Sequence, residues 1–367
     1  MNGGPIWKKS FISIRFFRKK IMNSRERVLT VFEHEKPDRV PMWCGASDEF
    51  WRKAKQSLCL DDESLRIRFY DDFRRVTAPY RGKQKPLMPN AVYQTPFGID
   101  RHGLGYGQPI NHPLADASLQ EIHDYTWPDS RDVDISNIKV DAQKYNKQYA
   151  ILGGDWSPFW HDAIDLLGME NFLIKMHTEP QIVDAVLEHI VDYYFESSKR
   201  IFDSAAEYID IFFIGNDLGS QTGPLVGETL FRRFVLPHIQ RLVDLGHAYK
   251  LKVMMHCCGG IAQLIPALIE VGLDGLHAVQ TSCSGMDLKT LKTEFGSKIV
   301  FNGAIDSHHI LIDGTPDYVR QKTCEILDIM KPGSGYIAGA SHDTILEETP
   351  VENVLTMFDT IYEYGIY

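Results

Sequence analysis

From about residue 148 onward, short apolar runs alternate with longer amphipathic stretches. Apolar runs of this length predict buried β-strands, and the 3.6-residue periodicity between them predicts helices. Because strand and helix alternate regularly, we expect parallel strands joined by right-handed crossovers. The predicted strands lie at 149–154, 208–215, 251–257, 274–280, 298–304 and 335–341.

Two segments nearer the N-terminus bring the strand count to eight: "VPMWC" (40–44) and "RFYDDFRRV" (68–76). Eight alternating strands favour a closed (β/α)8 TIM barrel over an open doubly wound sheet. Between 77 and 147 the pattern breaks down into a stretch rich in Gly, Pro and aromatic residues. This stretch predicts an inserted hairpin or lid within one barrel domain that spans residues 22–367.

Several helix ends are marked in the sequence. Asn23 and Glu26 have capping-box spacing, and Thr315 precedes Pro316 as an N-cap would. For the last helix the expected N-terminus is Thr349 as the cap and Pro350 at the first helical position. Gly365 is expected to end that helix.

Residues 1–21 carry six basic side chains and no acidic one. Arg15 interrupts the apolar stretch, so a secretory signal is not expected. We interpret the segment as a disordered extension that precedes the fold, the alternative being a basic arm that binds a membrane surface.

Charge and cysteine content narrow the class of protein. The net charge of −10 argues against nucleic acid as a partner, and no apolar run approaches the roughly 18 residues of a membrane span. The six cysteines are scattered through a long chain without a secretory signal. They predict a cytoplasmic protein without a disulfide framework.

In a barrel of this kind, functional residues lie at the carboxyl ends of the strands. Polar and aromatic side chains collect at these predicted ends: Trp43, Asp155, Trp156, Asn216, Asp217, His256, Cys258, Gln280, Asn302, Asp306, His342 and Asp343. The sequence therefore predicts one site at this rim.

The segment "LKVMMHCCGGI" (251–261) carries the most specific chemistry. Side chains alternate along a strand, so His256 and Cys258 point to one side and Cys257 to the other. Nitrogen and sulfur ligands suit zinc, and Gly259 and Gly260 allow a sharp turn after the strand. The alternative is that the cysteines pack as small apolar residues, which we expect of Cys257.

Several of the other candidate residues have a structural alternative. Asp217 is a candidate catalytic carboxylate, or an Asx-turn residue that fixes its loop. Gln221, Gln280 and Asn302 are candidate substrate ligands, as is Asp306, which could instead cap the next helix. The aromatic residues Trp43, Trp156, Phe159 and Trp160 could line a cleft or pack in the core, with Trp43 the candidate for substrate contact.

Several ordered motifs resemble the uroporphyrinogen decarboxylase superfamily. They include "RERVLTVFEHEKPDRVPMW", "GNDLGSQTGPLV", "VMMHCCGGIAQLIPALIEVGLDGLHAVQ", "FNGAID" and "TPVENV". The resemblance extends from Met22 to Tyr367 and implies the (β/α)8 barrel. True decarboxylases resemble one another in an "RQAGR" segment after the first strand, where this chain has "MWCGASDEF", without arginine.

The chain is more similar to the cobamide-dependent methyltransferase branch, of the methylcobamide:coenzyme M type. That resemblance implies zinc bound by His256, Cys258 and a third residue. The family's later cysteine is absent near the last strand, where His342 is the candidate, with Cys283 in reserve. It also implies a corrinoid protein as partner, carrying methylcobamide, and a small methyl donor or acceptor. Homodimers are common among such barrels.

The sequence leaves three functions open. The preferred prediction is a zinc-dependent methyltransferase that acts between a methylated corrinoid protein and a thiol or tetrahydrofolate-type acceptor. The second is a metal-free, decarboxylase-like enzyme with a smaller substrate, using Asp217. The third is a non-catalytic barrel that binds a corrinoid protein.

Overall fold

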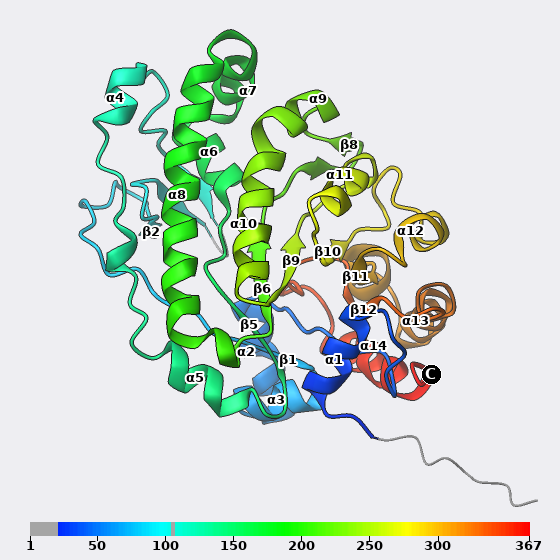
Figure 1. The fold of residues 1–367 in the computed structure, drawn as a ribbon. Helices are drawn as coiled ribbons and strands as arrows, with labels where there is room; N and C mark the ends of the chain where they lie inside the picture. Colours follow the sequence, from blue (N-terminus) through cyan, green and yellow to red (C-terminus); the bar gives the residue numbers. More distant parts are fainter. Residues whose placement is uncertain (1–20, 104–106) are drawn as a thin grey trace, which may run out of the picture.

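A computed structural model describes residues 21–103 and 107–367 (Figure 1). The basic segment predicted to precede the fold lies outside the described residues, apart from Ile21.

Seven parallel strands form the central sheet, which curls on itself (Figure 1). Helices follow the strands along the chain, which explains why neighbouring strands are parallel. The sheet order is β1 (Phe73–Arg75), β5 (Ala150–Gly153), β6 (Ile211–Gly215), β9 (Lys252–His256), β10 (Gly275–Val279), β11 (Val300–Ile305) and β12 (Tyr336–Ala340). All six strands predicted from residue 148 onward are confirmed.

The two predicted N-terminal strands are shorter than expected. Helix α3 continues to Arg68, so the strand predicted at 68–76 is reduced to β1. The segment predicted as a strand at 40–44 forms only an isolated parallel bridge, between Met42 and Ala338 of β12. Pro41 has no backbone N–H to donate, which limits regular pairing there. The prediction of eight regular strands is therefore wrong by one.

The Met42 segment nevertheless contacts both edges of the sheet. Trp43 N donates to the carbonyl of Ala338 in β12 at 2.9 Å. On the other side, Asp72 N, immediately before β1, donates to the Met42 carbonyl at 3.0 Å. Backbone hydrogen bonds therefore link β12 to the residue that precedes β1.

Apolar side chains fill both faces of the sheet. Helix α1 (Ser24–Phe32) places Val28, Val31 and Phe32 against the inner face, at the end where the strands begin (Figure 1). These residues pack with one inner cluster drawn from six of the seven strands: Phe73, Ala150, Leu152, Ile211, Phe213, Met254, Val300 and Ile337. The opposite end, where the strands finish, is left for polar side chains.

The outer face is covered by helices, so strands buried on both sides read as continuous apolar runs in the sequence. Their bounds are α2 (Asp48–Leu58), α3 (Asp62–Arg68), α6 (Phe159–Leu167), α7 (Met169–Thr178), α8 (Pro180–Ala205), α9 (Glu228–Leu230), α10 (Leu236–Ala248), α11 (Ile265–Glu270), α12 (Leu288–Phe295), α13 (Pro316–Met330) and α14 (Val351–Tyr364).

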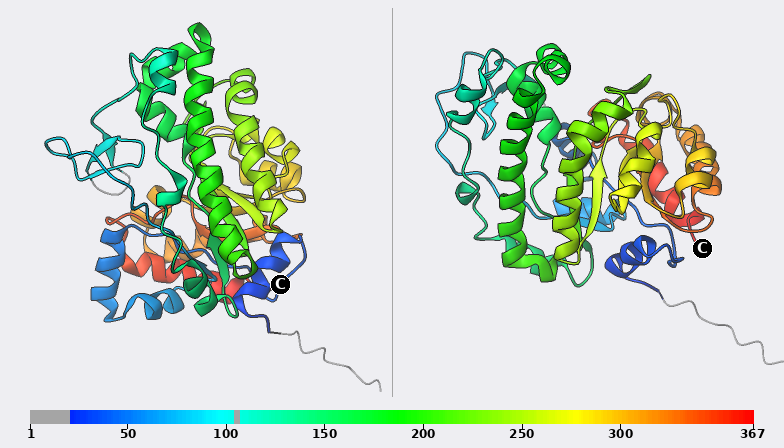
Figure 2. Two further views of the ribbon diagram at one scale, coloured as in Figure 1. Left: turned by 60° about the vertical axis from the view of Figure 1, so that its left-hand side comes forward. Right: turned by 45° about the horizontal axis from the view of Figure 1, so that its top comes forward.

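The segment between 77 and 147 contains a small antiparallel sheet and two short helices. These are β2 (Tyr93–Gln94), β3 (Asp100–His102), β4 (Gln108–Pro109), α4 (Leu119–His123) and α5 (Ile138–Tyr145). The segment runs along the outer side of α8 (Figures 1 and 2). Phe97 makes edge contacts with Tyr193 and Tyr194 of α8, and Arg101 pairs with Asp165 of α6. Its role as a lid stays a prediction.

The helix ends follow the sequence signals with one exception. The Asn23–Glu26 capping box and the Thr315 cap are both present. Gly365 ends α14 as predicted. The predicted Thr349 cap is wrong, because Pro350 is the N-cap of α14 and no side chain caps this helix.

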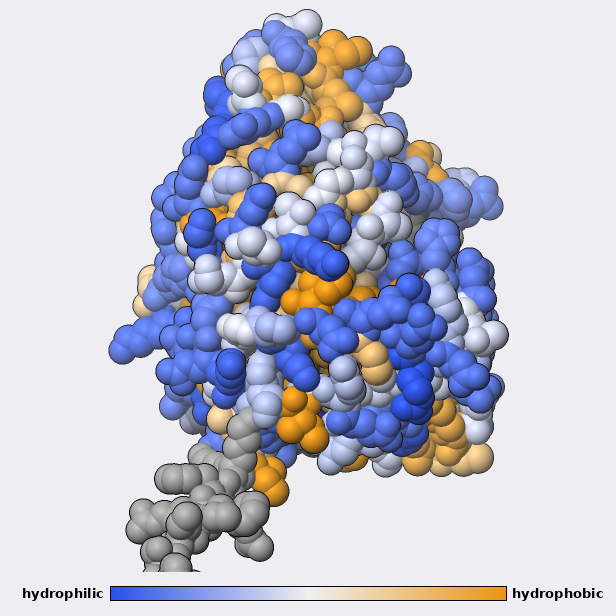
Figure 3. All heavy atoms as spheres, turned by 90° about the vertical axis from the view of Figure 1, so that its right-hand side faces the viewer, coloured by the Kyte–Doolittle hydropathy of each residue, from blue (hydrophilic) through white to orange (hydrophobic). Residues whose placement is uncertain are grey.

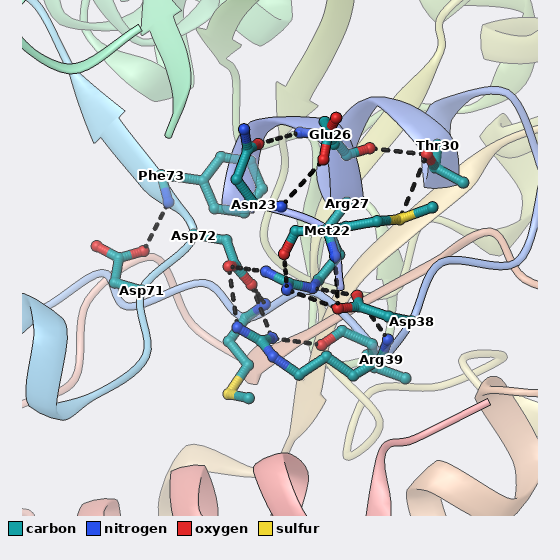
Figure 4. A network of polar contacts seen from close by, with 12 residues as sticks. Met22, Asn23, Glu26, Arg27, Thr30, Asp38, Arg39, Asp71, Asp72 and Phe73 are labelled. Carbon is teal, nitrogen blue, oxygen red and sulfur yellow. Dashed lines mark hydrogen bonds and ion pairs between the residues drawn. The ribbon is translucent and has the colours of Figure 1, made fainter. Parts of the chain in front are cut away.

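Buried ion pairs join α1 to the Met42 segment and to the start of β1 (Figure 4). The fully buried Asp72 accepts from Arg27 Nη1 at 2.8 Å and from Arg39 Nη1 at 2.9 Å. The same carboxylate accepts the Met42 N–H at 2.8 Å. Arg27 also pairs with Asp38 at 2.7 Å. One carboxylate thus ties together α1, the Met42 segment and the start of β1.

The face drawn in Figure 3 is mainly hydrophilic, with hydrophobic side chains in separate small patches. Within the described part of the chain, every helix is too short or too polar to span a membrane.

We expect Asp72→Asn to lower the free energy of unfolding by about 3–5 kcal/mol, because it removes the buried carboxylate that Arg27 and Arg39 share and leaves Arg27 with Asp38 alone. The matched control is Asp359→Asn, which breaks the Arg68 pair, whose side chains are 36% and 31% exposed. The control should cost about 1 kcal/mol or less. Urea unfolding of both variants measures the difference, and equal losses would contradict the role assigned to Asp72.

Candidate metal centre

The ends of β6, β9 and β10 bring the central polar residues together. His256 is the last residue of β9, and Asp217 follows the end of β6. In the sheet register His256 lies beside Gly215 of β6 and His277 of β10. Parallel strands in register point equivalent side chains to the same face, so the two histidines share the inner side of the sheet.

His256, Cys258 and Asp217 form one compact group. Cys258 Sγ lies 3.3 Å from His256 Nε2, and Asp217 Oδ1 lies 3.2 Å from the same nitrogen. One ligand atom from each residue lies within 4.8 Å of the other two. Nitrogen, sulfur and carboxylate oxygen are all ligands of zinc, so the group can hold a metal ion.

The other ring nitrogen of His256 faces a second group. His256 Nδ1 lies 3.1 Å from His277 Nδ1, and both rings are buried. His256, His277 and Asp343 also have ligand atoms within 4.8 Å of one another. His277 can therefore orient the His256 ring while Nε2 faces Cys258 and Asp217.

The charges around His256 shift several pKa values. Burial disfavours the imidazolium of His256, but the negative charges of Cys258 and Asp343 and the hydrogen bond with Asp217 outweigh it and raise the pKa. Burial and the neighbouring His256 lower the pKa of His277 well below its usual value, which keeps that ring neutral. For Asp217, burial is outweighed by His161 and His256, which hold the carboxyl pKa far below its ordinary value.

Asp217 is also fixed in position by the surrounding backbone and by α6. Its Oδ1 accepts the Cys258 N–H at 2.7 Å, and Oδ2 lies 3.2 Å from His161 Nε2. Asp217 therefore does not serve as an Asx-turn residue within its own loop, but bonds to the loop after β9 and to α6. Asp217 lies in the metal group that we expected His342 to complete.

Two glycines let the loops after β6 and β9 approach each other. Gly259 has a φ of +92°, and a Cβ there would lie 2.3 Å from the backbone of Gly219. Gln280 Oε1 accepts the Gly259 N–H at 2.7 Å, so this predicted substrate ligand holds the loop. Cys257 points into the core, 1% exposed, as predicted.

Other predicted site residues lie outside both groups. His342 Nδ1 lies 3.0 Å from the Thr344 carbonyl, and Cys283 Sγ lies 3.6 Å from Gln280 Oε1. Among the described residues, neither belongs to a cluster that could hold a metal. Their assignment as ligands stays a prediction.

The remaining substrate candidates differ in their surroundings. Asp306 caps the short helix Ser307–Ile312 and accepts from His308 N and His309 N. This is the capping role that was the alternative to substrate binding. Gln221 is exposed at the turn between β7 (Gly219–Ser220) and β8 (Gly223–Pro224). Asn302 is fully buried, and its Oδ1 has no hydrogen-bond partner among the described residues.

The four aromatic residues divide into two pairs. Phe159 and Trp160 are completely buried in the outer core. Trp43 and Trp156 belong to the inner cluster near the metal group. Trp43 lies 4.8 Å from the His277 ring and Trp156 lies 5.7 Å from the His256 ring, between ring centroids.

Sequence reasoning missed His277, His161 and the metal-binding geometry of Asp217. His277 lies within the predicted strand 274–280, and aligning that strand with 251–257 would have placed it beside His256. His161 had no comparable signal, because it comes from α6 and meets Asp217 only through the folded loop.

Comparisons with known proteins extend over most of the chain. Residues 108–364 match the uroporphyrinogen decarboxylase (URO-D) family. The methylcobamide:CoM methyltransferase MtbA of Methanosarcina acetivorans is 23% identical over 231 residues, 62% of this chain and 62% of that protein. The uroporphyrinogen decarboxylase of Psychromonas ingrahamii is 22% identical over 192 residues, 51% of this chain and 50% of that protein.

The matched stretches therefore span less than two thirds of the length of both relatives. A solved structure of a methyltransferase from Methanosarcina mazei has a TM-score of 0.66 at 18% identity, covering 94% of this chain and 99% of that one. This likeness supports the α/β fold with its curled parallel sheet. On these grounds the chain belongs to the uroporphyrinogen decarboxylase (URO-D) family, and within it is more similar to the methylcobamide:CoM methyltransferases than to the decarboxylases.

Proposed function

We propose that the protein is a zinc-dependent methyltransferase that moves a methyl group between a methylated corrinoid protein and a thiol or tetrahydrofolate-type acceptor. The observation that carries the proposal is the group of His256 Nε2, Cys258 Sγ and Asp217 Oδ1 at the strand ends. The similarity to MtbA, whose name states a methylcobamide substrate, supports the corrinoid partner.

The donor atoms fit zinc. Zinc bonds of about 2.0–2.3 Å in a tetrahedron require ligands to lie about 3.3–3.6 Å apart. The separations of 3.2 Å and 3.3 Å from His256 Nε2 are close to this requirement. Three protein ligands leave a fourth position for the acceptor, as is usual in catalytic zinc sites.

The residues of this chain have separate roles in the proposed reaction. His256, Cys258 and Asp217 would hold zinc, which lowers the pKa of a bound thiol and favours the nucleophilic thiolate. The neutral His277 keeps His256 Nε2 directed at the site. His161 and the Cys258 N–H hold the Asp217 carboxylate in place.

With a thiol acceptor, the thiolate attacks the methyl carbon on the corrinoid of the partner protein. The sulfur–carbon bond forms as the cobalt–carbon bond breaks, and both electrons of the broken bond stay on cobalt. Trp43 and Trp156 provide apolar surface next to the His277 and His256 rings.

Metal content tests the proposed ligand set. We expect about one zinc per chain in protein purified without a metal-binding tag, and little zinc in Cys258→Ser or Asp217→Asn, because each loses a ligand. Cys59→Ser is the control, since Cys59 is exposed. Mass spectrometry measures the zinc. If His342→Ala loses zinc and Asp217→Asn retains it, the third ligand is His342 and not Asp217. Absence of metal from the well-folded parent would overturn the zinc mechanism and favour the metal-free alternative.

Methyl transfer tests the reaction itself. We expect methylcobalamin with a thiol to give a methyl thioether and cob(I)alamin, followed by visible absorbance under anaerobic conditions. Cys258→Ser should lower the rate by at least about 100-fold, because it removes a residue that activates the nucleophile. A zinc-loaded parent without activity toward methylcobalamin or a methylated corrinoid protein, with thiol and tetrahydrofolate acceptors alike, would contradict the proposal.

Backbone geometry gives a further check. Gly259→Ala should reduce zinc binding, because the new Cβ would meet the Gly219 backbone and separate the two loops. Gly227→Ala is the matched control, since a Cβ there meets nothing within 4 Å. Zinc content and circular dichroism are the readouts, and unchanged zinc in Gly259→Ala would show that the loop contact is not required.

A further inference from the structure

Arg75 lies on the inner face of the sheet. It is the last residue of β1, where Phe73 points into the inner cluster and Arg74 pairs with Glu63 at 2.7 Å on the other side. Alternation therefore turns Arg75 inward. Its guanidinium lies 5.0 Å from the ring centroid of Trp156 and 5.5 Å from that of Phe213.

Within the described residues, Arg75 has no ion pair, unlike its arginine neighbours. Arg66 pairs with Asp71 at 2.9 Å, whereas no carboxylate lies within 4 Å of the Arg75 guanidinium. Arg75 is solvent-exposed, yet surrounding protein atoms lower its pKa despite the charges of Asp343 and Asp155. Its exposed surface faces a recessed cavity that it lines, where its N–H groups have no carboxylate partner and are free to bind an anion.

The cavity beside Arg75 has a volume of about 180 Å³. Its lining includes Trp43, Gly45, Leu152 and Asp343, together with Asp71, whose charge is paired with that of Arg66. Trp43 is 8% exposed, and its indole Nε1 has no hydrogen-bond partner in the described part of the chain. A Cβ at Gly45 would lie 2.9 Å from this nitrogen, so glycine leaves the indole N–H uncovered.

The cavity adjoins the candidate metal centre. Asp343 lines the cavity, and its carboxylate lies within 4.8 Å of ligand nitrogens of both His256 and His277. Trp156 contacts Arg75 and also lies 5.7 Å from the His256 ring. A small molecule that fills the cavity therefore reaches the residues around the candidate metal centre.

We propose that Arg75 and Trp43 form a receptor for a compact oxoanion (carboxylate, sulfonate or phosphate) on the substrate. The guanidinium presents paired N–H donors that match two oxygens of such a group, and the indole N–H supplies one more donor. The claim that this substrate is the methyl acceptor rests on the proposed function. The acceptor then carries an anion at one end and its nucleophilic atom at the other.

A matched pair of thiols tests the receptor by isothermal titration calorimetry on the protein as purified. 3-Mercaptopropionate should bind at least about tenfold more tightly than 3-mercapto-1-propanol, which has the same thiol but no charge. Arg75→Gln should abolish this preference and leave alcohol binding unchanged. Arg75→Lys should keep part of it, and Trp43→Phe should weaken it.

The control is Arg241→Gln, which removes an arginine that is paired with Asp192 and partly exposed. It should bind both thiols like the parent. Circular dichroism establishes that each variant is folded. Equal affinity of the parent for the two thiols, or an equal loss of both in folded Arg75→Gln, would overturn the receptor.

Anions without a thiol separate this proposal from the proposed function. Propionate, ethanesulfonate and ethyl phosphate need no activated sulfur, and the one that binds most tightly identifies the preferred oxoanion. Binding that disappears in Arg75→Gln supports the receptor even in protein that holds no zinc and transfers no methyl group. Absence of binding of all three to the parent, or binding that Arg75→Gln leaves unchanged, would refute it.

Discussion

The structure depends on the pairing of Asp72 with two arginines. A buried carboxylate is stable only with partners, and Asp72 takes its partners from segments that are distant along the chain. Because the same carboxylate accepts the Met42 N–H, the segment between the two edges of the sheet is held where it can bond to both. Trp43, the next residue, is thereby placed against His277. The segment around Met42 thus links the buried ion pairs of Asp72 to the histidines at the carboxyl ends of the strands.

The inner face of the sheet changes character along its length. Apolar side chains of α1 and of the strands fill it where the strands begin. At the other end the filling includes His256, His277 and Asn302, all buried. Burying imidazole and amide groups reduces stability unless they have hydrogen-bond partners, and Asn302 Oδ1 has none in the described part of the chain. Such groups are expected where a protein has been selected to bind a ligand as well as to fold.

Much of the fold could be predicted from the sequence because its signals are local. Strands buried on both faces appear as apolar runs, and caps such as Asn23 depend on residues three positions apart. The His-x-Cys pair was also readable, since its two residues are close in sequence at the end of one strand, and their side chains do lie together. The eighth strand was not, because 40–44 forms a single bridge whose place depends on Asp72.

The third ligand and Arg75 could not be predicted for a related reason. Asp217 reaches Cys258 only because two loops meet at Gly219 and Gly259, a contact between segments about 40 residues apart. The segment 42–50 contains no arginine and so gives no sign of a cation at this cavity, whereas β1 supplies Arg75 to it.

The position of Asp217 has a consequence for how the protein takes up an ion. Its carboxylate contacts α6 through His161, the end of β9 through His256 and the following loop through the Cys258 N–H. An ion bound at this point would cross-link segments that otherwise meet through a few hydrogen bonds. Metal affinity and the order of these loops are then one equilibrium, so anything that tightens the loops also strengthens metal retention.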